Sequence, residues 1–83
     1  MATVKQKEQR RAMTGALALA QQVSQFPASR LWLDYDAEAD VLYISLRRPQ
    51  KATETIEKDE EGLLLHYRGN DLVGITVLEA SRR

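Results

Sequence analysis

Two hydrophobic periodicities divide the chain, one helical and one of period two. From residue 4 to about residue 25, apolar side chains recur at steps of three and four, which is typical of one face of a helix. This stripe consists of Ala12, Ala16, Leu19, Val23 and Phe26, and it is widened by Met13, Leu17 and Ala20. Pro27 closes the pattern, because the residue before a proline avoids the helical conformation. The spacing therefore predicts one helix over residues 4 to about 25.

From Arg30 onward, apolar and polar positions alternate, which indicates β-strands. Five short runs fit this pattern, at 31–35, 41–46, 53–58, 63–68 and 72–78, with turn-forming residues at 36–40, 59–62 and 69–71. Short turns favour antiparallel pairing of consecutive strands. The sequence therefore predicts an α+β fold: an N-terminal α-helix plus an antiparallel five-stranded β-meander sheet.

These patterns divide the chain into an amphipathic helix with a basic start (1–28) and a sheet domain (29–83). A single sheet with one apolar face needs a cover, and the helix is the only candidate within the chain. The sequence leaves two arrangements open, because the helix can cover its own sheet or that of another copy. An 83-residue chain buries only about 60–65% of its unfolded surface, so we expect a partner or second copy on any remaining apolar face.

Charge is balanced overall but unevenly placed, with 12 basic and 12 acidic residues in total. The helix carries Lys5, Lys7, Arg10 and Arg11 against Glu8. Residues 34–61 include nine acidic and four basic residues. A basic N-terminal arm, the start of the helix, is therefore attached to an acidic sheet region. Such an arm, together with Arg82 and Arg83, is a candidate for phosphate contacts. Zero net charge and the lack of interleaved aromatic residues favour a solubilising helix end instead.

Cysteine is absent, which excludes disulfides, thiolate metal sites and a cysteine nucleophile, and which suits a reducing cytoplasm. No apolar run approaches the roughly 20 residues that a membrane span requires, and no secretory signal is evident. We therefore expect a cytoplasmic protein that does not bind membranes.

Acidic residues alternate in one stretch, at Asp34, Asp36, Glu38 and Asp40. A calcium loop of the EF-hand type needs a glycine at its sharp turn and a bidentate glutamate at its end. Ala39 and Ser45 occupy those two places here. We interpret Asp36, Glu38 and Asp40 as a structural turn stabilised by hydrogen bonds from side chain to backbone, and we expect no metal site.

His66 is the only histidine, which leaves no Ser-His-Asp arrangement within the chain unless a partner contributes residues. One histidine without cysteines is also too little for a zinc site. The acidic run 57–61 lies in a turn, where solvent surrounds the carboxylates. We therefore predict no catalytic residues, no cofactor and no small-molecule substrate.

The sheet region resembles DUF2283, a bacterial family of uncharacterised proteins. The matching pieces are Tyr35-Asp36, Glu38-Ala39-Asp40, Leu42-Tyr43-Ile44, Gly62, Tyr67, Leu72-Val73-Gly74-Ile75 and Leu78-Glu79-Ala80-Ser81. The chain departs from the family pattern at Arg68, where an acidic residue is usual, and at Thr76, where glutamate is common. The resemblance implies a small α+β domain without an established activity. Some members are encoded beside small RNase-like toxins and are proposed as antitoxins.

These observations favour a non-enzymatic protein-interaction module, antitoxin-like by resemblance, that neutralises a small toxin. In this hypothesis the helix docks on a protein partner through Leu17, Leu19, Val23 and Phe26. Two alternatives remain. One is a structural homo-oligomer, and the other is a nucleic-acid-binding regulator that uses the basic arm.

Overall fold

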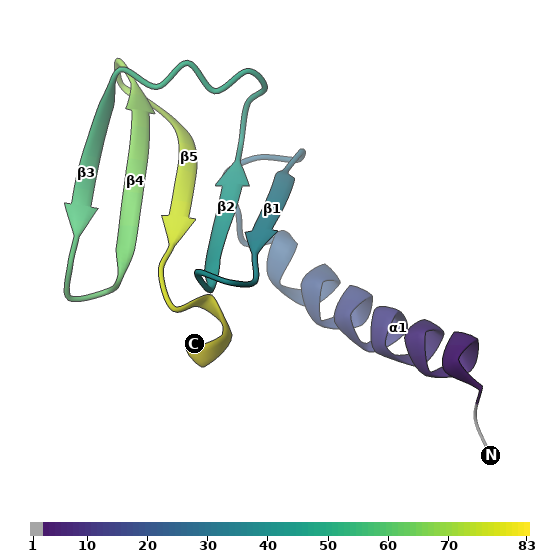
Figure 1. Cartoon of the computed structure of the whole chain (residues 1–83). Coiled ribbons are helices and arrows are strands. Elements are labelled where there is room, and N and C mark those ends of the chain that lie inside the picture. Colours follow the sequence, from purple (N-terminus) through teal and green to yellow (C-terminus); the bar gives the residue numbers. More distant parts are fainter. Residues whose placement is uncertain (1–2) are drawn as a thin grey trace.

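The computed structural model describes residues 3–83, which form one α-helix, five strands and a short 3₁₀ helix (Figure 1). The elements are α1 (Val4–Val23), β1 (Trp32–Asp36), β2 (Val41–Ser45), β3 (Glu54–Lys58), β4 (Leu63–Arg68), β5 (Asp71–Val77) and η1 (Ala80–Arg82). All strand pairs of the sheet are antiparallel, which confirms the predicted α+β fold. Residues 1 and 2, part of the predicted segment 1–28, lie outside the described residues.

Helix α1 begins at a capping box. The Thr3 hydroxyl accepts a hydrogen bond from the Gln6 backbone N–H at 3.1 Å, and the Gln6 side chain accepts one from the Thr3 N–H at 2.8 Å. The helix ends at Val23, about two residues earlier than the spacing predicts. The next turn is tighter, because Phe26 N–H donates to the Val23 carbonyl, three residues back, at 3.1 Å.

The strand order is β1-β2-β5-β4-β3, so the predicted meander order is wrong in one respect (Figure 1). Strand β5 lies between β2 and β4, and the segment after β2 crosses to β3 at the far edge. The strands β2 to β5 thus form a Greek key. Burial agrees with this order: β5, at the centre, has three buried residues, whereas β3, exposed at every residue, suits an edge.

The register gives the sheet two different faces. One, the apolar face, carries side chains from all five strands: Leu33, Tyr35, Leu42, Ile44, Leu46, Val73, Ile75, Val77, Leu63, Leu65 and Ile56. The other, the mixed face, carries Trp32, Asp34, Tyr43, Ser45, Thr55, Leu64, His66, Gly74 and Thr76. One face of the sheet is thus mainly hydrophobic, and the other face carries most of the polar side chains of the strands.

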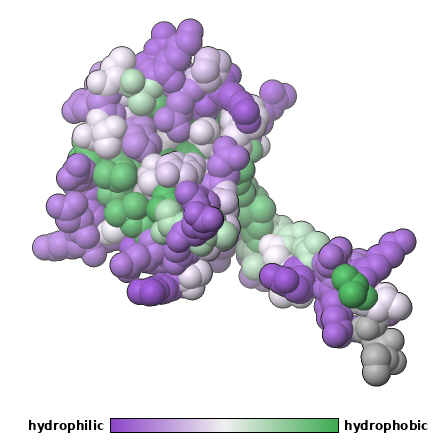
Figure 2. Space-filling view, in the orientation of Figure 1, coloured by the Kyte–Doolittle hydropathy of each residue, from purple (hydrophilic) through white to green (hydrophobic). Residues whose placement is uncertain are grey.

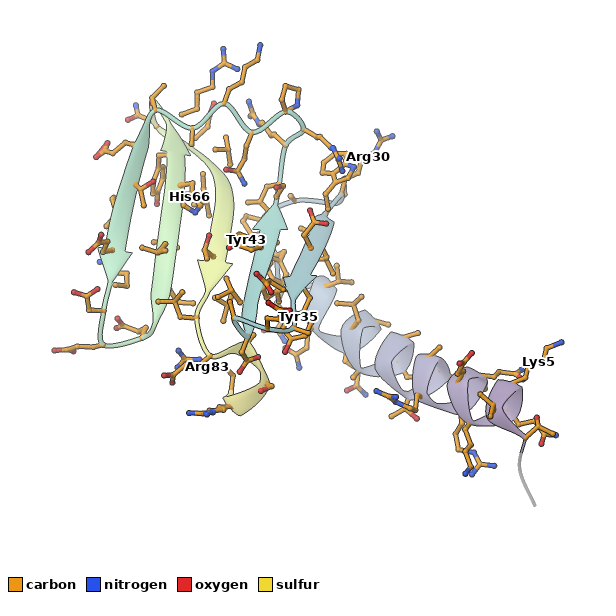
Figure 3. The ribbon with its side chains drawn as sticks, viewed as in Figure 1. Lys5, Arg30, Tyr35, Tyr43, His66 and Arg83 are labelled. Carbon is orange, nitrogen blue, oxygen red and sulfur yellow. The ribbon has the colours of Figure 1, made fainter. Side chains whose placement is uncertain are left out.

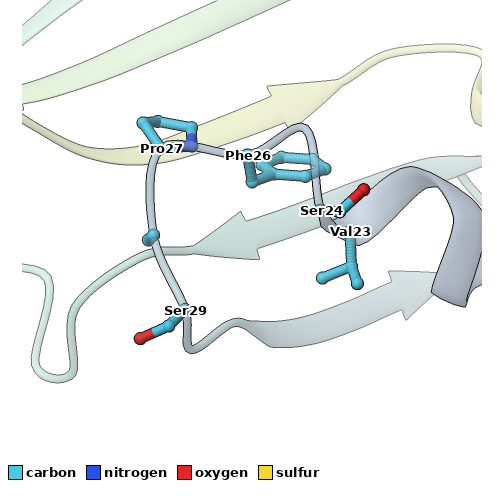
Figure 4. A pocket seen from close by; sticks show the side chains of 6 residues that line it. Val23, Ser24, Phe26, Pro27 and Ser29 are labelled. Atoms are coloured by element: carbon cyan, nitrogen blue, oxygen red, sulfur yellow. The ribbon is translucent and has the colours of Figure 1, made fainter.

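The core is small and lies at one end of the apolar face. Ile44, Leu46 and Val73 are the buried hydrophobic residues of the described chain, and Val73 is fully buried. The linker 24–31 passes over β2 and β5 (Figures 1 and 4). Its Pro27 and Ala28 line a shallow pocket together with Leu46. The linker therefore covers only the Leu46 end of the face.

Helix α1 does not cover its own sheet. Every residue from Val4 to Gln22 is exposed, and the helix projects away from the sheet domain, giving extents of 53 × 25 × 20 Å (Figures 1 and 2). The radius of gyration is 15.1 Å, compared with about 12 Å for a compact chain of this length. Of the two arrangements that the sequence left open, the structure does not show the one in which the helix covers its own sheet.

Candidate functional site

The apolar stripe of α1 is solvent-exposed along most of its length. Met13, Leu17 and Leu19 are exposed by 58%, 69% and 46%. At 100° per residue, Ala16 and Ala20 lie at the centre of the stripe between these larger side chains. Small residues at the centre of a helix face allow a flat surface to approach closely.

The four predicted anchors fall into two groups. Leu17 and Leu19 are exposed on α1, whereas Val23 and Phe26 are half-buried. Val23 and Phe26 lie around the linker pocket, next to Pro27 and Ala28 (Figure 4). The first pair is therefore available to a partner, and the second pair belongs to the junction between helix and sheet.

The opposite side of α1 is polar. Lys7, Arg11 and Thr14 lie there with Ala18, roughly 180° from the centre of the stripe. Two alanines only two residues apart, Ala16 and Ala18, thus lie on opposite faces of the same exposed helix. They offer a matched pair of positions for testing which face matters.

The acidic stretch forms the turn between β1 and β2. Asp36 Oδ1 accepts hydrogen bonds from the backbone N–H groups of Glu38 at 3.1 Å and Ala39 at 3.2 Å. Asp40 has a positive φ of 55°, a left-handed conformation that aspartate tolerates better than most residues. The turn predicted at 36–40 is thus held together by its own side chains.

Asp40 also ties this turn to the end of the chain. Its carboxylate accepts hydrogen bonds from the Tyr35 hydroxyl at 2.6 Å, the Ser81 N–H at 3.0 Å and the Ser81 hydroxyl at 2.8 Å (Figure 3 labels Tyr35). Its backbone carbonyl accepts from Ala80 N–H at 2.9 Å. Sequence reasoning missed Ser81 and Tyr35 as partners of Asp40, although both residues lie in the pieces that carry the family resemblance.

These contacts shift two pKa values in opposite directions. Hydrogen bonds from the Tyr35 hydroxyl and then from Ser81 lower the pKa of the Asp40 carboxyl. The hydrogen bond to the Asp40 carboxylate raises the pKa of Tyr35. Asp40 is thus an ionised acceptor whose oxygens are already engaged. Among residues 3–83, no three His, Cys, Asp or Glu side chains are grouped so that they could hold a metal ion.

His66 bridges three strands on the mixed face (Figure 3). Its Nδ1 lies 2.9 Å from the Thr55 hydroxyl on β3, and its Nε2 lies 2.8 Å from the Thr76 hydroxyl on β5. Thr76 is the buried polar residue of the described chain, exposed by 6%. Both ring nitrogens are thus paired with hydroxyls, and no carboxylate orients the ring as a catalytic base would require.

Gly74 of β5 makes room for the side chain of Gln50. A Cβ at position 74 would collide with the Gln50 amide, which donates from Nε2 to the Ser45 hydroxyl at 3.0 Å. The strand register shifts next to it, between His66 and Tyr67. At the centre of the mixed face, the polar side chains therefore form hydrogen bonds with one another, as Gln50 does with Ser45 and His66 with Thr76.

A family model described as a protein of unknown function, DUF2283, matches residues 32–81. The chain belongs to this family. No curated protein and no solved structure matches the chain. The matched segment covers the whole sheet and most of η1, so α1 and the linker lie outside the DUF2283 domain.

The geometry shows what the DUF2283 pieces do in this chain. The two pieces that are most distant in sequence, 35–40 and 78–81, meet at Asp40. The departure at Thr76 falls on the residue that pairs with His66. No helix of the described residues is long and apolar enough to cross a bilayer. Helix α1, which has no buried residue, lies outside the matched domain.

Proposed function

We propose that this protein is a non-enzymatic protein-interaction module, that α1 is its docking element, and that its partner is a small toxin that it neutralises. The observation that carries the proposal is a helix of 20 residues with no buried side chain. Helix stability in proteins comes mainly from packing of an apolar face against other elements. The exposed stripe thus fits a helix-in-groove interaction.

The exposed acidic residues of the sheet domain favour a partner with a basic surface. The β3–β4 hairpin presents Glu54, Glu57, Asp59, Glu60 and Glu61, and all five residues are exposed. A ribonuclease must attract a polyanionic substrate, so its active face is basic. Acidic side chains would complement such a face and speed association. The antitoxin role itself is supported by the DUF2283 resemblance.

The test is co-expression with the product of the adjacent reading frame. We expect that product to arrest growth when expressed by itself, and to be inactive and co-purified when this chain is present. Leu17→Glu places a charge in the apolar stripe and should abolish both effects, because an unpaired buried charge is strongly unfavourable. Ala18→Glu adds the same charge to the opposite face and should leave both effects unchanged.

A neighbouring product that is neither toxic nor co-purified would overturn the proposal. So would equal behaviour of the two variants. Binding of nucleic acid by the chain, weakened steeply by salt, would instead favour the basic residues Lys7, Arg10 and Arg11 as the functional surface.

A further inference from the structure

We infer that, in the absence of another partner, α1 of each chain lies across the apolar face of a second copy, giving a reciprocal homodimer. The inference rests on the proposed function in taking α1 as the docking element, and it adds the surface and the partner. Both surfaces are on the same chain: the stripe of α1 is exposed, and the linker covers only the Leu46 end of the apolar face. An isologous two-fold dimer would pair each helix with the other copy's sheet.

The exposed area supports a dimer. A compact monomer of 9.4 kDa exposes about 5,000 Å², whereas this chain exposes 6868 Å², an excess of roughly 1,900 Å². Obligate dimers bury about 2,000–5,000 Å² in total. Two copies that each lost this excess would fall within that class.

The docking surface is a row of apolar side chains that crosses all five strands. Leu33 pairs with Ile44, Ile44 with Ile75, Ile75 with Leu65, and Leu65 with Ile56. Its two ends, Leu33 and Ile56, are exposed by 44% and 37%. The apolar row therefore continues to both edges of the sheet, where nothing in the chain's own fold covers it.

The lengths of the two surfaces agree. Five strands spaced about 4.8 Å apart make the apolar row about 19 Å wide. The stripe of α1 from Ala12 to Val23 is about 17 Å long at 1.5 Å per residue. The next row of the same face, Leu42, Val77 and Leu63, lies about 7 Å further from the linker. A helix about 10 Å across can therefore rest on both rows.

Charge is complementary as well. Helix α1 carries Lys5, Lys7, Arg10 and Arg11 against Glu8, whereas residues 32–83 carry eleven acidic and seven basic side chains. Two copies in this arrangement place each basic helix on an acidic domain. The linker opposes the alternative of folding back, since Val23 and Phe26 would leave their half-buried places beside Pro27.

The chain has no cysteine, so introduced cysteines report contacts directly. Leu17 is midway along the length of the stripe and Ile75 is at the centre of the apolar row, which makes this pair independent of helix direction. A mixture of the Leu17→Cys and Ile75→Cys variants should form a disulfide-linked heterodimer under oxidation. A mixture of Ala18→Cys and Ile75→Cys should not, because Ala18 is on the opposite face.

Sedimentation equilibrium of the purified chain should give about twice the 9.4 kDa monomer mass. Ala16→Glu should weaken the dimer about tenfold or more, and Ala18→Glu should leave its dissociation constant unchanged. A monomer at all concentrations would overturn the inference. So would a disulfide between two Leu17→Cys helices in place of the expected pair, or an intrachain disulfide in the Leu17→Cys, Ile75→Cys double variant. None of these results depends on the toxin, so the proposed function is tested separately.

Discussion

Helix α1 and strand β5 are both rich in apolar residues, yet their environments are opposite. Helix α1 has good helix formers and a complete capping box, but none of its 20 residues is buried. Strand β5 has seven residues, and Val73, Gly74 and Thr76 are all buried. Local sequence thus accounts for α1, whereas neighbouring strands on both sides account for β5. The difference teaches that tertiary packing surrounds β5, whereas α1 has no such packing within the described residues.

The largest test of this contrast is Ile44→Ala. Ile44 on β2 is exposed by only 7%, so its truncation should lower the free energy of unfolding by about 2–5 kcal/mol at every protein concentration. Leu17→Ala, on the exposed stripe, should act only through dimerisation, and its effect should vanish on dilution. Urea unfolding followed by Trp32 fluorescence measures both. Equal, concentration-independent losses would contradict the contrast.

Thr76→Val should have the next largest effect. The substitution keeps the shape but leaves His66 Nε2 without its partner in a part-buried position, at a cost of about 1–3 kcal/mol. Thr55→Val removes the other hydroxyl, at the exposed end of the same bridge, and should cost less. Thermal unfolding of the two variants compares them. A larger loss for Thr55→Val would mean that the bridge is anchored at β3 and not at β5.

Asp40→Asn should change the pH dependence of stability. The folded pKa of Asp40 is lowered, so its contribution is complete above the ordinary value of about 3.8 and is lost as pH falls through the folded pKa. Asparagine keeps the left-handed turn without this titration, so the variant should lose less stability on acidification than the natural chain. Tm measured from pH 5 downward tests this expectation. Parallel curves for the two proteins would contradict it.

The hydrogen bond between Tyr35 and Asp40 also predicts a loss of folding stability at alkaline pH. The folded pKa of Tyr35 is raised, so its contribution is complete below the ordinary value of about 10.0 and is lost as pH rises through the folded pKa. Spectrophotometric titration of the chain and of Asp40→Asn should differ in one tyrosine transition, that of Tyr35, which the substitution moves to lower pH. The transition should be unchanged by Thr55→Val, which does not touch this cluster.

Thr3→Ala should have the smallest effect on the sheet. Loss of the N-cap costs a helix about 1 kcal/mol, but the first turn of α1 contacts no part of the sheet and lies outside the apolar stripe. We expect reduced helix content by circular dichroism and an unchanged unfolding midpoint by Trp32 fluorescence. A shifted midpoint would show that the first turn is coupled to the sheet.

The sequence predicted the elements better than their arrangement. Periodicity located α1 and all five strands within about two residues, because each pattern is local. The position of β5 between β2 and β4 depends on pairing between residues such as Ile44 and Ile75, and no local pattern reports it. The hydrogen bonds of Asp40 to Ser81 and of His66 to Thr76 were missed for the same reason. The partner-binding role of Leu17, Leu19, Val23 and Phe26 stays a prediction.

The strand order also has a consequence for how the chain folds. The β1–β2 and β3–β4 hairpins can form from nearby residues, but each is a two-stranded unit of marginal stability. Strand β5 is synthesised after the four strands that it joins, and its pairing with β2 closes a long loop, which is slow. Cooperative folding must therefore wait for β5. Without it, the chain has two separate hairpins and no sheet.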